Sequence, residues 1–295
     1  MTDLADLVDD VDALVARLDD VGYLADPGLA TALFCAVRLP QPLILEGEAG
    51  VGKTEAAKAL ALVLDTPLIR LQCYEGIDAA EALYEWNYQR QLLGIRLAEA
   101  KGRDLDEHDL FGADYLVGRP LLDAIRHPGP RPAVLLIDEI DRADDEFEAF
   151  LFELLAESAV TIPELGTITA EVPPIVVLTS NRTRDLHDAL KRRCLYHWID
   201  YPDLDRAVQI IRRRVPASST GLAEQIAAGV ARLRTLDLQK QPGIAEAINW
   251  TLALDLLGAR SLDADAAQRT LGSVLKYRED VELARQRGLE WVAGA

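Results

Sequence analysis

The chain has 295 residues and a formal net charge of −18, with 49% hydrophobic and 27% charged residues. This composition is typical of a globular protein with one large domain or two smaller ones. The acidic charge argues against a nucleic-acid-binding protein, because such proteins hold phosphates with clustered lysine and arginine. No apolar run approaches the ~20 residues that span a bilayer, so a membrane span is not expected.

The beginning of the chain predicts an amphipathic helix. Over residues 3–20, leucine and valine recur at helical spacing with acids on the other face, and the stretch lacks the basic start of a signal peptide. Cys35, Cys73 and Cys194 lie far apart without a C-x-x-C pair, so we expect neither a disulfide framework nor a zinc knuckle. A reducing, cytoplasmic location fits both observations.

Residues 47–54 complete the phosphate-loop motif G-x-x-x-x-G-K-[ST] between a predicted strand, 42–46, and a predicted helix, 53–64. Glycines let backbone N–H groups point at phosphate oxygens, the lysine adds charge for the β- and γ-phosphates, and the threonine hydroxyl can ligate Mg²⁺. A glycine turn that binds nothing is the alternative, and the strand-loop-helix setting argues against it. The predicted nucleotide-binding residues are Gly47, Glu48, Ala49, Gly50, Val51, Gly52, Lys53 and Thr54.

An aromatic stretch follows the second predicted strand, 67–71. Tyr84, Trp86 and Tyr88 alternate with polar residues, which predicts a strand with one aromatic face. This face is either a satellite core under a loop or a surface that grips a substrate or partner. Residues 94–131 are polar and predict loops, with a turn at 117–120.

Asp138 and Glu139 come directly after a buried strand, 133–137. A hydrophobic strand that ends in two acids is the second signature of a phosphate-loop NTPase, in which the strand delivers Asp138 to the Mg²⁺ shell and Glu139 to the attacking water. The acidic pair could instead cap the next helix. The phosphate loop upstream favours the catalytic interpretation.

Further polar residues follow a predicted helix (145–157), a β-hairpin around Gly166 (160–169) and a buried strand (175–179). The amide of Asn181 can hold the hydrolytic water opposite Glu139. Arg192 and Arg193 precede a strand at 195–199. They form either a solvated surface or, in a ring-forming NTPase, a pair that reaches a neighbour's γ-phosphate.

The C-terminal part predicts helices alone, over 203–214, 222–236, 244–258, 262–276 and 278–293. With Pro202 as the hinge, the predicted domains are a nucleotide-binding core with its N-terminal helix, 1–202, and a helical lid, 203–295.

These motifs, in their order and spacing, resemble those of an AAA+ ATPase and, more narrowly, of the MoxR family. The resemblance covers about residues 22–200 and rests on EGEAGVGKTEAAKALA, GRPLLDAI, DEIDRADDEFEAFLFELLAE with the hairpin before TSN, and LKRRC. The stretch LQCYEGIDAAEALYEWNYQRQLL is similar to one branch, the ATPases encoded beside molybdenum-containing carbon monoxide dehydrogenases.

The resemblance implies an α/β fold: an αβα core with a five-stranded parallel sheet and a small C-terminal helical lid. It implies ATP at 47–54, Mg²⁺ on Thr54 and Asp138, Glu139 as the catalytic base and Asn181 as sensor 1. Arg192 and Arg193 become arginine-finger candidates in a ring of identical subunits, usually a hexamer. Implied partners are a von Willebrand factor A domain protein and a client metalloenzyme that the ATPase matures or remodels, such as a molybdenum hydroxylase.

One departure from the family concerns the lid. Ile244 occupies the place of the sensor-2 arginine, and Lys240 is the candidate substitute. Two other function classes stay open: a nucleic-acid-associated AAA+ NTPase, such as a helicase loader or restriction GTPase, and a small-molecule phosphate-loop kinase. The acidic charge weighs against the first, and a kinase has no use for Asn181 with the two arginines.

Overall fold

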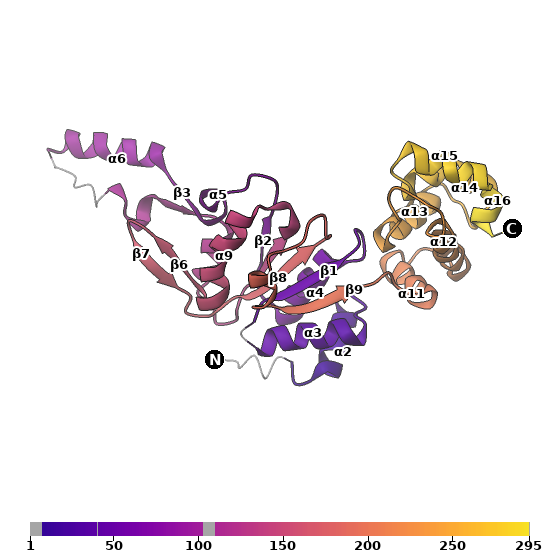
Figure 1. Cartoon of the computed structure of the whole chain (residues 1–295), viewed down its shortest axis with the longest axis horizontal. Helices are drawn as coiled ribbons and strands as arrows, with labels where there is room; N and C mark the ends of the chain where they lie inside the picture. Colours follow the sequence, from indigo (N-terminus) through magenta and orange to yellow (C-terminus); the bar gives the residue numbers. More distant parts are fainter. Residues whose placement is uncertain (1–7, 40, 103–109, 295) are drawn as a thin grey trace. The chain divides into compact units, whose positions relative to one another are not determined.

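The computed structural model describes residues 8–39, 41–102 and 110–294 of the chain (Figure 1). These residues form two compact units. The first unit holds residues up to 21, 25–46 and 54–197, and the second holds 22–24, 47–53 and 198 onward. Each unit has its own hydrophobic core.

A five-stranded sheet has the strand order β2-β5-β8-β1-β9. β1 and β5 both pair in parallel with β8, and β2 pairs in parallel with β5. β1, β5 and β8 are buried throughout, which explains their largely apolar sequences. Because β8 lies between β1 and β5, the residues that follow these strands meet at one edge of the sheet. The strands are β1 (Leu43–Gly47), β2 (Leu68–Gln72), β5 (Val134–Asp138), β8 (Ile175–Ser180) and β9 (Leu195–Ile199).

Several helices of the first unit begin at side-chain caps. Asp26 accepts a hydrogen bond from the Leu29 N–H at 2.9 Å, and Pro27 takes the first helical position, where its missing N–H is not needed. α3 contacts β8, and α8 contacts β2 and β5. The predicted αβα core is confirmed. Its helices are α2 (Val11–Asp20), α3 (Pro27–Arg38), α4 (Lys53–Leu64), α5 (Ala79–Leu83), α8 (Pro120–Ile125), α9 (Asp145–Glu157) and α10 (Asp188–Lys191).

The first helix is shorter than expected over its described part. It begins at Val11, because Asp10 has an extended backbone and its carboxylate accepts the Ala13 N–H at 2.7 Å. The earlier part of the predicted helix, residues 3–7, lies outside the described residues.

The expected aromatic strand is wrong beyond Trp86. β3 (Tyr84–Trp86) ends there, because the Asn87 side chain accepts the Arg90 N–H at 3.0 Å and caps helix α6 (Tyr88–Ala100). Trp86 is buried, whereas Tyr88 is 63% exposed. Trp86 therefore belongs to the core and Tyr88 to the surface.

Residues 94–131 contain more regular structure than the expected loops. α6 continues to Ala100, a short 3-10 turn spans Ala113–Tyr115, and β4 (Leu116–Gly118) pairs antiparallel with β3. The polarity of residues 94–131 did not predict α8, because this helix is only six residues long. It nevertheless buries four apolar side chains: Leu121, Leu122, Ala124 and Ile125. The predicted hairpin is confirmed as β6 (Ala159–Ile162) and β7 (Gly166–Thr169).

The second unit is helical from α11 onward and packs around Trp250. This side chain is fully buried, and its Nε1–H donates to the Thr270 hydroxyl at 2.7 Å. The expected helix 278–293 is in fact two helices, because Gly288 adopts a φ of +107° between them. Among the described residues, no helix combines the length and apolarity required to cross a bilayer. The helices are α11 (Leu204–Arg214), α12 (Thr220–Leu233), α13 (Ile244–Leu256), α14 (Ala264–Val274), α15 (Arg278–Arg287) and α16 (Leu289–Ala293).

We predict that Trp86→Ala lowers the free energy of unfolding by about 3–5 kcal/mol, the usual cost of truncating a large buried aromatic side chain. Trp86 packs edge-on against Tyr84 and Phe111, with ring centroids 5.8 and 5.2 Å away. The control, Tyr88→Ala, should change stability by less than about 0.5 kcal/mol because this side chain is exposed. Urea denaturation followed by circular dichroism measures both, and equal effects would contradict the assignment.

Candidate functional site

The phosphate loop follows β1 and leads directly into α4. Gly47 and Gly50 have φ values of +154° and +81°, which favour glycine. At Gly47, a Cβ would also overlap the carbonyl oxygen of Ile199. The motif glycines are therefore needed by the backbone at these positions, independently of any ligand.

Lys53 is held inside the loop. Its side chain is 6% exposed, and its Nζ donates to the carbonyl oxygens of Gly47 at 2.7 Å and Glu48 at 2.8 Å. These contacts keep a positive charge close to the loop backbone, as binding of a polyphosphate requires.

Asp138 is a buried charge of the first unit. Its side chain is 3% exposed, and both oxygens are engaged. Thr54 Oγ1 donates to Asp138 Oδ1 at 3.0 Å, Thr179 Oγ1 donates to the same oxygen at 2.5 Å, and Arg70 Nη2 lies 2.5 Å from Oδ2. Thr54 and Asp138 are 84 positions apart in sequence, so the fold brings the two predicted metal ligands together. A hydroxyl and a carboxylate are hard oxygen donors, which fit Mg²⁺ with water and phosphate as its further ligands.

Arg70 is a residue that the sequence analysis missed. It lies within β2, where the apolar run predicts a strand but gives no role to the charge. The sequence signal that could have identified it was a single arginine inside that apolar run. In the structure Arg70 is the cation that compensates the Asp138 carboxylate, and a buried carboxylate requires such compensation.

Glu139 and Asn181 follow the adjacent strands β5 and β8. Glu139 adopts a left-handed φ of +56°, which a non-glycine residue holds only under structural constraint. The constraint is its N–H, which donates to Thr179 Oγ1 at 2.9 Å. The Glu139 carboxylate lies 3.1 Å from Arg142 Nε. Glu139, the candidate catalytic base, is thus positioned by its backbone N–H, and its carboxylate pairs with Arg142.

Arg192 and Arg193 differ in their surroundings although both are exposed. The Arg193 guanidinium lies over the Phe152 ring, 4.7 Å from the centroid. The Arg192 side chain has no hydrogen bond or ion pair with any described residue. Neither arginine bonds to Glu139 or Asn181. Arg193 therefore packs on an aromatic ring of its own chain, and Arg192 makes no such contact with a described residue.

Within the second unit, the start of α13 contacts the phosphate loop. Ala245 N–H donates to the Gly50 carbonyl at 3.2 Å. A Cβ at Gly243 would lie 2.8 Å from Gly50 backbone atoms and 2.9 Å from the Ala49 carbonyl oxygen. Ile244, at the place where an arginine is usual in the MoxR resemblance, is buried. Helix and loop therefore meet through backbone atoms.

Other residues hold the segment before α13 in place. Arg234 Nε donates to the Pro242 carbonyl at 2.7 Å, and its guanidinium lies 3.9 Å from the centroid of the Tyr201 ring. Glu246 accepts the Gly243 N–H at 2.9 Å and caps the helix. Burial lowers the pKa of Arg234 from its ordinary value. Lys240, the candidate substitute for the missing arginine, is exposed.

We predict that Gly243→Ala weakens nucleotide binding by about tenfold or more, because the added methyl group must displace the phosphate-loop backbone and such overpacking typically costs 1–3 kcal/mol. Gly221→Ala is the matched control. Apart from its chain neighbours and the backbone of its own helix, no atom lies within 4 Å of the added Cβ. Titration with a fluorescent ATP analogue measures both variants. Equal affinities would show that the contact with α13 does not position the loop.

The chain is similar to several known proteins. An uncharacterized protein of Staphylococcus aureus (strain USA300) is 28% identical over 233 residues, covering 77% of this chain and 80% of that protein. One of Staphylococcus haemolyticus (strain JCSC1435) is 26% identical over 218 residues, covering 72% and 74%. Among solved structures, a RuvB mutant of Thermotoga maritima matches 89% of this chain and 71% of its own, with 18% identity and a TM-score of 0.49.

A model of the AAA domain family, dynein-related subfamily, matches residues 42–194. This is just over half of the chain, and it spans the phosphate loop, Asp138, Glu139, Asn181 and both arginines. The predicted AAA+ assignment and the predicted enzyme class, ATPase, are confirmed at this level. The chain therefore belongs to the dynein-related subfamily of the AAA domain family.

Proposed function

We propose that the chain is a MoxR-type AAA+ ATPase that binds ATP with Mg²⁺ and couples its hydrolysis to the remodelling of a client protein. The observation that carries the chemical part is the hydrogen bond between Thr54 and Asp138, 3.0 Å long. It joins the end of the phosphate-loop motif to the acidic end of β5. Phosphate-loop NTPases use this pair to hold a metal ion on the nucleotide.

Each remaining residue has a role in the proposed reaction. Lys53 neutralises the β- and γ-phosphates, and bound Mg²⁺ would supply further charge neutralisation there. Glu139 accepts a proton from the attacking water while Asn181 orients that water. The water oxygen forms a bond to the γ-phosphorus, the bond to the β,γ-bridging oxygen breaks, and ADP leaves with that electron pair.

We infer a ring of identical subunits from the surroundings of the two arginines, and the MoxR resemblance gives six as the expected number. An arginine finger that acts on a neighbouring subunit must not be held by a contact within its own subunit. Arg192 meets this condition, whereas Arg193 lies over the Phe152 ring. This favours Arg192 as the finger that stabilises transition-state charge in a neighbour.

The biological part of the proposal rests on the MoxR resemblance. The chain would act in the cytoplasm, beside a von Willebrand factor A domain protein, and assist maturation or metal-cofactor assembly of a client enzyme such as a molybdenum hydroxylase. Its net charge of −18 supports a protein client over a nucleic acid, because a polyanion would be repelled.

We predict that Glu139→Gln binds ATP but hydrolyses it at least ~100-fold more slowly, within the range for losing a general base. Lys53→Ala should instead lose nucleotide affinity, since its charge serves binding. Phosphate release and equilibrium binding measured on the same preparations separate the two effects. Wild-type turnover in Glu139→Gln would remove this residue from the proposed mechanism.

We predict that Arg192→Ala lowers hydrolysis by ~10³-fold or more while ATP binding persists, because an arginine finger is typically worth 10³–10⁵ in rate. Arg193→Ala is the control and should retain much more activity. Mixing Arg192→Ala with Lys53→Ala subunits should restore part of the rate, since some interfaces then combine an intact pocket with an intact arginine. Activity that is independent of protein concentration and of mixing would contradict the ring.

A further inference from the structure

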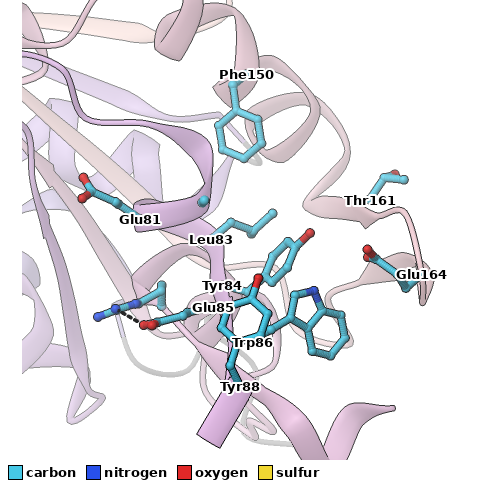
Figure 2. A pocket seen from close by; sticks show the side chains of 11 residues that line it. Glu81, Leu83, Tyr84, Glu85, Trp86, Tyr88, Phe150, Thr161 and Glu164 are labelled. Carbon is cyan, nitrogen blue, oxygen red and sulfur yellow. Dashed lines mark hydrogen bonds and ion pairs between the residues drawn. The ribbon is translucent and has the colours of Figure 1, made fainter. Parts of the chain in front are cut away.

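The first unit contains a groove of about 650 Å³ that is separate from the nucleotide motifs (Figure 2). Its walls come from α5, β3, the start of α6, α9 and the β6–β7 hairpin. Aromatic rings from three of these elements line it: Tyr84, Trp86, Tyr88 and Phe150. Its volume lies within the ~300–1,000 Å³ range of ligand sites, and its rings offer contact area at low entropic cost.

The charged residues of the groove are mainly acidic. Glu81, Glu85 and Glu164 line it with a single cation, Arg119. Arg119 pairs with Glu85 at 2.5 Å, as the dashed line in Figure 2 shows. Glu81 accepts a hydrogen bond from the Tyr74 hydroxyl, which leaves its charge in place. Glu164 has no ion-pair partner among the described residues. Two carboxylate charges in the groove therefore lack a cation.

The two uncompensated carboxylates lie on opposite sides of the aromatic rings in Figure 2. The pKa of Tyr84 is raised, first by burial and then by the nearby carboxylate of Glu164. A cation bound beside Tyr84 would meet the Glu164 carboxylate and a ring face together. Both contacts favour lysine or arginine.

β3 also offers backbone groups. It pairs only with β4 within the described part of the chain. Arg119 N–H donates to the Leu83 carbonyl at 3.0 Å and Asn87 N–H donates to the Tyr115 carbonyl at 2.8 Å. Because this pairing alternates along an antiparallel ladder, the N–H and C=O groups of Tyr84 and Trp86 point away from β4. An extended peptide can bond to such an edge.

We propose that this groove binds an extended segment of a client protein that carries a lysine or arginine next to an apolar residue. The inference rests on the proposed remodelling function and names the chemistry that selects the client. The apolar residue packs on the rings, and the cation bonds to Glu81 or Glu164. An acidic segment or a nucleic acid would meet like charge in the groove.

The test uses the full chain and two fluorescein-labelled decapeptides, one with two lysines around a leucine in a serine-glycine background, the other with glutamates in place of the lysines. We expect saturable binding of the lysine peptide alone, measured by fluorescence anisotropy without nucleotide. The double variant Glu81→Gln/Glu164→Gln should weaken binding by about tenfold or more, because both charge-assisted contacts are lost. Glu157→Gln/Glu171→Gln, two exposed glutamates outside the groove, is the matched control and should bind as the wild type does.

Three results would overturn the proposal: no saturable binding of the lysine peptide up to about 1 mM, equal binding of the two peptides, or equal loss in both double variants. Circular dichroism confirms that each variant is folded, and Tyr88→Ala gives an independent reduction in affinity if the tested pair fails to fold. A peptide that binds as expected yet leaves ATP turnover unchanged supports the groove and contradicts the proposed coupling to hydrolysis.

Discussion

The candidate site in the first unit depends on the buried carboxylate of Asp138. A negative charge this far from water is tolerated only when hydrogen bonds and a cation compensate it. Thr54, Thr179 and Arg70 supply that compensation from three different elements, α4, β8 and β2. Each of these elements is thereby tied to the end of β5. The same requirement orders the residues that the proposed hydrolysis uses.

Thr179 links this compensation to the catalytic candidate. Its hydroxyl donates to Asp138 and accepts the backbone N–H of Glu139. One small side chain on β8 thus holds both acids in register. A left-handed residue at the end of β5 is stable under this constraint, and it turns the chain directly into the short helix that carries Arg142.

Local patterns predicted the strands, the loop and the acidic pair, because each depends on a short run of residues: apolar side chains for burial, glycines for positive φ. The hairpin followed from the same signals, whereas the αβα core was predicted from the resemblance to AAA+ ATPases. Long-range contacts could not be predicted this way. The bond from Arg70 to Asp138 and the contact of Gly243 with Gly50 join residues distant in sequence, and no periodicity encodes them. The aromatic alternation was misleading at Tyr88, because the Asn87 cap overrides a strand pattern of five residues.

The short length of β3 has a consequence for how the chain avoids unwanted association. An unpaired strand edge is a template for aggregation, and proteins limit this hazard by keeping such strands brief. β3 and β4 have three residues each, so backbone pairing alone offers any passing chain only a few bonds. Self-stacking into a fibrillar sheet is therefore disfavoured. Discrimination between binding partners at this edge must come from the side chains around it. The short strands therefore limit aggregation and leave selectivity to those side chains.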